Sequence, residues 1–323
     1  MNRVLSLARN TYRERPIVLV LVGYVIASLL IVPQFASPKN LLDILVQSSD
    51  LIILSIGLGF VILNGGIDFS VTAVTALASV VGASIMNLDT GFLAHSPFGF
   101  PVAMLVMLLI GLAVAAINGL SVVFLKMPSF IATMATSLVF GGAAVYYTRS
   151  ATITNLPRAF TFMGDGTVVG IPFPIILAAV VVLVAQYALS STVFGRNVYA
   201  VGSNPKASFI SGVPVKKTIF ILFLLSGFLA ALGGALMSAR LGAGTPALGQ
   251  ERLMDIVAAV IIGGTSIFGG SGTVLGTVAG ALFITILNNS LNLVGIPWYM
   301  VIIVKGAVIF FIALFDAVRR LRR

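Results

Sequence analysis

The stretch GFPVAMLVMLLIGLAVAAIN occupies residues 99–118 and contains no charged side chain. A helix needs roughly 20 apolar residues to cross a hydrocarbon core about 30 Å thick, and this stretch has that length. Similar apolar runs recur from Ile17 to Phe315, separated by short charged stretches. Lipid offers no partners to open backbone groups, so each run is expected to be a helix. The pattern predicts an all-α integral membrane protein.

About ten transmembrane helices are predicted, and they form a single transmembrane domain over residues 1–323. The expected ranges are 17–36, 44–63, 69–88, 99–118, 128–147, 171–190, 217–238, 254–270, 273–293 and 298–315. An even number of spans places both termini on the same side of the membrane.

The basic residues predict which side that is, because cytoplasmic loops retain Lys and Arg. With the N-terminus inside, most of the 19 Lys and Arg fall on the cytoplasmic side. Lys305 falls within the last span, and five residues fall outside: Lys39, Arg149, Arg158, Arg240 and Arg252. Both termini are therefore expected in the cytoplasm. The non-spanning parts are a cytoplasmic N-terminal segment at 1–16, an external loop at 148–170 and a cytoplasmic loop at 191–217.

The composition excludes several classes of protein. Hydrophobic residues make up 59% of the chain and charged residues 9%, with a mean hydropathy of +1.13; a soluble domain carries about 25% charged residues. The pI near 10.3 does not indicate nucleic-acid binding, since the basic residues lie at the ends of apolar runs. The chain has no cysteine and one histidine, His95, so neither a thiolate nor a histidine-cluster metal site is predicted.

Two further motifs are missing. No Gly-x4-Gly-Lys-Ser/Thr sequence occurs, so the chain has no phosphate-binding loop of its own. No His-Glu-x2-His or Gly-x-Ser-x-Gly sequence occurs either, and no catalytic residue is predicted. ATP chemistry, where it is used, must come from another polypeptide.

The internal loop at 191–217 is the most polar stretch between the termini. Asn204-Pro205 and the small residues around it favour a turn into a short helix that begins near Pro205. Gly212 is expected to end this helix with a positive φ angle. Such a helix is suited to docking on a soluble partner; the alternative is a solvated connecting loop.

Four stretches carry motifs that are more specific together than singly. They are Phe194-Gly195-Arg196 with Tyr199 to Val213; Asn64-Gly65-Gly66-Ile67-Asp68-Phe69-Ser70; Pro128-Ser129-Phe130-Ile131-Ala132-Thr133; and Val260 to Thr277, which contains Gly263-Gly264 and Gly269-Gly270. From about residue 35 onward the chain resembles the ribose-type (monosaccharide) permeases of ABC transporters, which are binding-protein-dependent importers. Phe69 replaces the usual Leu of the family, and Thr72 replaces a usual Gly.

The resemblance implies a transport subunit rather than an enzyme. Its expected partners are cytoplasmic ABC ATPase subunits that bind ATP and Mg²⁺, an extracytoplasmic sugar-binding protein, and a second permease copy or paralogue. It implies a multi-pass location in the bacterial inner (cytoplasmic) membrane. It also implies that the internal loop couples the chain to the ATPase. The candidate coupling residues are Arg196, Asn204, Pro205, Lys206, Ala207, Ser211 and Gly212.

A second group of residues is a candidate for lining or shaping the translocation pathway: Asp50, Asn64, Gly65, Gly66, Asp68, Phe130 and Thr133. A charged carboxylate inside the membrane costs roughly 2.5–3.5 kcal/mol on insertion scales, which favours a functional role. Asp68 either orders a pathway wall or caps the helix that begins near Phe69. Asp50, beside Gln47, Ser48 and Ser49, either binds a sugar hydroxyl or holds helices together.

Small residues recur at intervals of four. Gly272, Gly276 and Gly280 are expected on one helical face, and Gly227, Ala231, Ala235 and Ala239 on another. Such rows let helices approach closely. Packing within the chain and a permease–permease interface both fit the pattern.

The leading hypothesis is the permease of an ATP-driven importer of a monosaccharide such as ribose or another pentose or hexose. Nucleosides or branched-chain amino acids are alternative cargoes. An autonomous ion-coupled carrier, with Asp50 or Asp68 as the proton site, is a third hypothesis. A membrane-embedded enzyme has no catalytic constellation to support it.

Overall fold

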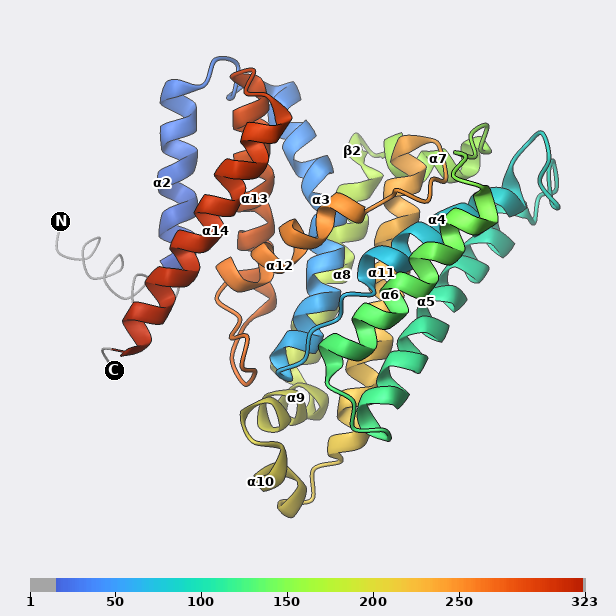
Figure 1. Cartoon of the computed structure of the whole chain (residues 1–323). Coiled ribbons are helices and arrows are strands. Elements are labelled where there is room, and N and C mark those ends of the chain that lie inside the picture. The colour runs from blue at the N-terminus through green and yellow to red at the C-terminus, as the bar shows by residue number, and fades with distance from the viewer. Residues whose placement is uncertain (1–15, 322–323) are drawn as a thin grey trace.

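A computed structural model describes residues 16–321 (Figure 1). The predicted cytoplasmic segment 1–16 lies outside the described residues except for Pro16, as do Arg322 and Arg323.

The described chain is mostly helical. Its apolar helices that coincide with predicted spans are α2 (Pro16–Ile31), α3 (Pro38–Leu63), α4 (Val71–Met86), α5 (Gly99–Val123), α6 (Ser129–Thr148), α8 (Phe173–Ser191), α11 (Val215–Leu241), α12 (Leu253–Ile262), α13 (Val274–Leu293) and α14 (Trp298–Leu321). Each of the ten predicted ranges overlaps one of these helices, and several of the helices extend beyond the predicted bounds. Six of them, α3, α5, α6, α8, α11 and α13, are long and apolar enough to cross a membrane by length and composition.

The predicted span 254–270 is wrong in its extent. Helix α12 has 10 residues and rises about 15 Å, half the thickness of the hydrocarbon core. Residues 263–273 are not helical, and Gly264, Gly269 and Gly270 have positive φ angles that no helix accommodates. Apolar residues occur in the predicted span beyond Ile262, at Ile267 and Phe268. The glycines nevertheless end the helix at Ile262.

The core of the protein is α3, the most buried of the candidate spans. Helix α11 packs against α3, α4 and α5. At its contact with α5, a Cβ atom on Gly227 would overlap the backbone oxygen of Gly111. The small residues Gly227 and Ala231 therefore serve packing within the chain at this contact.

Shorter elements lie at the two ends of the helices. The stretch between α6 and α8 contains helix α7 (Arg158–Asp165) and an antiparallel hairpin of β1 (Thr167–Val168) and β2 (Ile171–Pro172). The internal loop contains α9 (Val193–Ser203) and α10 (Pro205–Ile210). These two helices project at the opposite end of the molecule from α7, and the C-terminal end of α14 points toward their side (Figure 1).

Candidate functional site

The connection between α3 and α4 holds the buried carboxylate of Asp68. Residues 64–70 leave the helical conformation after Leu63 and regain it at Val71. Asp68 Oδ1 accepts hydrogen bonds from Ser70 N (2.9 Å) and Ser70 Oγ (2.6 Å). Its Oδ2 accepts one from Ser226 Oγ of α11 at 2.7 Å. Three donors thus compensate a carboxylate that is costly to bury.

Ser70 extends this network across the bundle. Its Oγ accepts a hydrogen bond from Asn118 Nδ2 of α5 at 2.8 Å, and Asn118 Oδ1 accepts one from Thr136 Oγ1 of α6 at 2.7 Å. Asp68, Ser70, Asn118 and Ser226 are all fully buried. The network joins α5, α6 and α11 to the 64–70 connection, so in this structure Asp68 fixes the connection within the core of the chain.

Helix α6 holds the same connection from its other side. Thr133 Oγ1 accepts from Phe69 N at 3.1 Å, and Ser129 Oγ accepts from Ile67 N at 3.1 Å. Thr133 is buried, whereas Phe130 is about half exposed on the surface of the chain. The structure therefore does not bring Phe130 and Asp68 into one polar site.

The remaining residues of the motif form the turn at the end of α3. Asn64 is the C-cap residue of α3, and its Oδ1 is buried without a hydrogen-bond partner among the described residues. Gly65 has a φ of +76°. A Cβ on Gly66 would lie 3.1 Å from Val61 Cγ1 and 3.4 Å from Ser129 Oγ. These residues let the chain turn tightly against α6.

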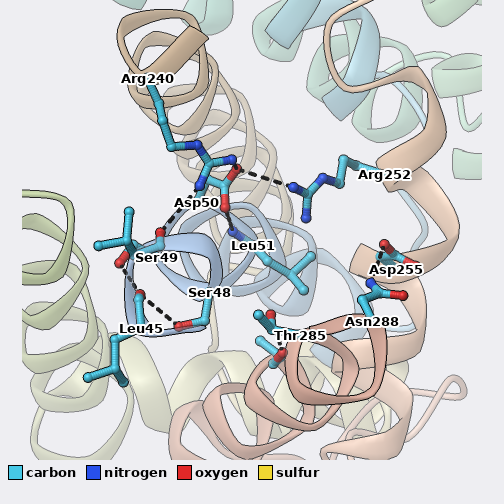
Figure 2. A network of polar contacts seen from close by, with 12 residues as sticks. Leu45, Ser48, Ser49, Asp50, Leu51, Arg240, Arg252, Asp255, Thr285 and Asn288 are labelled. Carbon is cyan, nitrogen blue, oxygen red and sulfur yellow. Dashed lines mark hydrogen bonds and ion pairs between the residues drawn. The ribbon is translucent and has the colours of Figure 1, made fainter. Parts of the chain in front are cut away.

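A second polar cluster surrounds Asp50 in the middle of α3 (Figure 2). Asp50 is 1% exposed, and its Oδ2 lies 2.9 Å from Arg240 Nη2 and 3.8 Å from Arg252 Nη2. Its Oδ1 accepts a hydrogen bond from Leu51 N. Both arginines come from segments predicted to be external, and both direct their guanidinium groups inward. The carboxylate holds the end of α11 and the start of α12 against α3.

The neighbouring serines do not join this ion pair. Ser48 Oγ and Ser49 Oγ both donate to Leu45 O within α3. Gln47 is exposed. The polar run around Asp50 is therefore divided between the cluster, the backbone of the helix and the surface.

A third charged contact adjoins the Asp50 cluster. Lys305 Nζ of α14 lies 2.9 Å from Asp255 Oδ1 of α12. Asn288 Nδ2 of α13 approaches Asp255 Oδ2 at 3.5 Å, and Asn288 Oδ1 is buried without a partner in the described chain. Lys305, expected within the last span, is thus paired. The Asp50 cluster and the Asp255–Lys305 pair together give a band of donors and acceptors across α3, α11, α12, α13 and α14.

The loop at residues 191–217 folds into two capped helices, α9 and α10. Thr192 Oγ1 caps α9 by accepting from Gly195 N, and Asn204 Oδ1 caps α10 by accepting from Ala207 N at 3.0 Å. Pro205 is the first residue of α10. Ser211 is its C-cap residue, and Gly212 follows with a φ of +80°. The short helix from Pro205 and the conformation of Gly212 match the expectation from the sequence; α9 was not predicted.

The surface of this loop is exposed and partly apolar. Phe209 is 73% and Ile210 is 86% exposed. Arg196, Lys206 and Ala207 are also exposed. The Arg196 side chain makes no hydrogen bond or ion pair with any residue that the structure describes. An apolar tip beside basic groups is suited to a protein partner.

The three glycines expected on one helical face are separated by the structure. Gly272 precedes α13, whose N-cap residue is Thr273, and so lies outside the helix. Gly276 and Gly280 are on α13, where Cβ atoms would overlap the backbone oxygens of Gly263 and Ala259. These two glycines bring α13 against α12 within one chain.

Several residues of the site were not singled out from the sequence. Ser226 lies in an apolar helix, and Arg240 and Arg252 fall in outer segments of the predicted topology, between spans. Asn118 and Asn288 lie within predicted spans, where only residue type and position mark them. The one usable signal for the arginines is their position at the ends of apolar runs, since a carboxylate within a predicted span, such as Asp50, needs a partner.

Comparisons with known proteins find one matching family profile and several similar permeases. A family profile described as "Branched-chain amino acid transport system / permease component" matches residues 40–313. The ribose import permease protein of Haemophilus influenzae is 38% identical over 315 residues, which cover 96% of this chain and 95% of that protein. The ribose import permease protein of Bacillus subtilis is 38% identical over 88% of this chain and 86% of its own length.

A relative that is named for another sugar is similarly close. The D-allose transport system permease protein of Escherichia coli is 36% identical over 276 residues, or 85% of this chain and 82% of that protein. No solved structure matches this chain.

Proposed function

The chain belongs to the family of membrane permease components that its profile describes, and on this basis we propose that it is the permease subunit of an ATP-driven, binding-protein-dependent importer of a monosaccharide. It is a transport protein, with several helices suited to crossing a membrane. The observation that carries the proposal is the capped helix α10 with its exposed Phe209 and Ile210. A surface of this kind needs a partner outside the membrane.

The proposed partner is a cytoplasmic ATPase that binds ATP and Mg²⁺. The chain has no phosphate-binding loop of its own, so ATP hydrolysis requires another subunit. An extracytoplasmic binding protein would deliver the sugar at the end of the molecule that carries α7. A second permease copy or a paralogue would complete the pathway.

A monosaccharide is the cargo that the relatives favour. Proteins 31–38% identical to this chain are named for ribose, D-allose, galactose or xylose. The band of Asp50, Arg240, Arg252, Asp255 and Asn288 offers both donors and acceptors, which sugar hydroxyl groups require. We place the sugar contacts near this band because Asn288 Oδ1 is buried there without a partner among the described residues, whereas both Asp68 oxygens accept hydrogen bonds from serine.

The topology has ten membrane-embedded helices with both termini in the cytoplasm. Helix α12 is a half-length helix within it, and the glycine-rich segment 263–273 completes the path to α13. The bacterial sources of the relatives favour the inner membrane as the location.

The test is reconstitution in proteoliposomes with the ATPase and the binding protein. ATP-dependent accumulation of radiolabelled ribose, allose, galactose or xylose is expected, and none without the ATPase. Accumulation by the chain alone under a proton gradient would contradict the proposal and favour an ion-coupled carrier. Accumulation of a nucleoside or a branched-chain amino acid, but of no sugar, would change the cargo and leave the ATP dependence intact.

A further inference from the structure

Three backbone segments that are distant in the sequence meet beside the internal loop. They are the end of α3 at Leu63, the end of α9 at Gly202, and the glycine-rich segment before α13. Gly270 N donates a hydrogen bond to Leu63 O at 2.8 Å. A Cβ on Gly202 would overlap Leu63 O and would lie 2.7 Å from Gly270 N. Only a residue without a side chain fits here, so backbone packs directly on backbone.

The glycines on the opposite side of this contact are equally constrained. A Cβ on Gly269 would lie 2.7 Å from Gly65 N and 2.9 Å from Gly202 O, and a Cβ on Gly270 would lie 2.6 Å from Ser203 Oγ. The contact therefore leaves no room for sliding without a backbone shift. We call Leu63, Gly202, Gly269 and Gly270, together with Tyr199, the glycine junction.

Tyr199 adds a directed hydrogen bond to the junction. Its hydroxyl group donates to Gly272 O at 2.8 Å. Burial raises the pKa of the Tyr199 phenol above its ordinary value, which keeps the hydroxyl group protonated and able to donate. Helix α9 is thus tied to the start of α13 by a side chain and to the end of α3 by backbone.

The connection from the junction to α10 is short and stiff. Asn204 alone separates α9 from α10, and it caps α10 with its own side chain. Beyond the junction, Leu63 leads through residues 64–70 to the buried Asp68 network. Thr273, which follows Gly272, caps α13 by accepting from Gly276 N at 3.0 Å. A displacement of α10 therefore meets no flexible linker before it reaches α3 and α13.

From this geometry we propose that the glycine junction passes movement of α10 to the inner ends of α3 and α13, with Tyr199 and Gly202 as positioning residues for coupling. The inference rests on the proposed function, since the force on α10 comes from the ATPase. It goes beyond docking: binding of the ATPase requires the surface of α10, whereas transport also requires the junction behind it.

The experiment compares ATP hydrolysis with sugar uptake in reconstituted complexes. Tyr199→Phe removes one hydroxyl group and keeps the ring; Tyr187→Phe on the exposed face of α8 is the matched control. Gly202→Ala inserts a methyl group into the junction; Gly142→Ala, where a Cβ would meet nothing within 4 Å, is its control.

In the Tyr199→Phe and Gly202→Ala complexes, recovery of the ATPase and the rate of hydrolysis should stay within about twofold of the parent. The ratio of sugar transported to ATP hydrolysed should fall at least about fivefold in Gly202→Ala and severalfold in Tyr199→Phe. A fivefold change corresponds to the lower end of the coupling free energies that are typical between two sites of a protein.

The outcomes separate the two proposals. An unchanged ratio in Tyr199→Phe would overturn the role of the junction while leaving the proposed function in place, even where Gly202→Ala fails to assemble. A parent complex without ATP-dependent uptake would overturn both. Equal loss of the ratio in Tyr187→Phe or Gly142→Ala would also overturn the junction, since the effect would not depend on it.

Discussion

Arg240 and Asp50 lie 190 residues apart in the chain, yet Arg240 Nη2 and Asp50 Oδ2 are 2.9 Å apart. The carboxylate is fully buried, and the arginine side chain is 28% exposed. Arg252 approaches the same oxygen only to 3.8 Å. The two arginines therefore provide a matched comparison of a close and a distant partner for one buried charge.

Arg240→Gln is expected to lower the free energy of unfolding by about 3 kcal/mol, because it leaves a buried carboxylate without its close partner. This value is at the lower end for a buried pair, since the partial exposure of Arg240 allows water to replace it. Arg252→Gln should cost less than about 1 kcal/mol. Thermal midpoints of the detergent-solubilised variants measure the difference. Equal midpoints for the two variants would show that the distance to Asp50 does not decide the energetics.

Asp68→Asn tests whether the buried carboxylate supports the structure or carries a proton. The amide keeps one acceptor and turns an NH₂ group toward hydroxyl donors, so a loss of about 2 kcal/mol of stability is expected. Ser226→Ala should cost about 1 kcal/mol, and Ser190→Ala, on the exposed end of α8, less than about 0.5 kcal/mol. The thermal midpoint should therefore be lowest for Asp68→Asn, higher for Ser226→Ala and highest for Ser190→Ala.

The same Asp68→Asn protein is then measured for transport. In an ATP-driven permease, the folded fraction should still transport sugar in proportion to ATP hydrolysed. Complete loss of uptake in protein that is fully folded and hydrolyses ATP would assign Asp68 a direct role in the pathway. Proton-driven uptake by the parent that Asp68→Asn abolishes would instead support an ion-coupled carrier.

The positions of the helices were predictable from the sequence because long apolar runs report membrane helices directly. The half-length of α12 was not predictable, since Gly263 and Gly264 end the helix although apolar residues continue beyond them. Helix α9 was missed because it lies outside the apolar runs. Its amphipathic pattern, with Val198 and Val201 buried, is short and is interrupted by Gly195 and Gly202.

The site was less predictable than the fold. The glycine motifs and the end of α10 could be located in the sequence because turn residues act locally. The partners of Asp50 and Asp68 could not, since Arg240 and Ser226 reach them only through the packing of α11 against α3 and α4. A single sequence contains no information on which of several arginines meets a given carboxylate.

Cysteine labelling tests the proposed orientation, because the chain has no native cysteine. Lys206→Cys places a thiol on the exposed face of α10, and Thr167→Cys places one on the exposed hairpin. An impermeant maleimide should label Thr167→Cys in intact cells, and Lys206→Cys only after permeabilisation. The reverse result would invert the topology. Ser208 is unsuitable for this test because it is buried.

Gly212→Val and Arg196→Ala test the contact with the ATPase. Gly212 has a φ of +80°, and a Cβ there would meet no atom within 4 Å. A substitution therefore acts through backbone strain, about 1–2 kcal/mol for an ordinary residue and less for Asn, which tolerates this conformation. Gly212→Val should reduce ATPase recovery or uncouple hydrolysis from uptake, with membrane insertion intact, and Gly212→Asn should have a smaller effect.

The Arg196 side chain is exposed and has no partner among the described residues, so its partner is expected on the ATPase. Arg196→Ala should weaken recovery of the ATPase severalfold, about the effect of one charged contact at an interface, whereas Lys39→Ala at the other end of the molecule should not. Normal assembly, hydrolysis and uptake in both Gly212→Val and Arg196→Ala would show that residues 191–217 are only a connector.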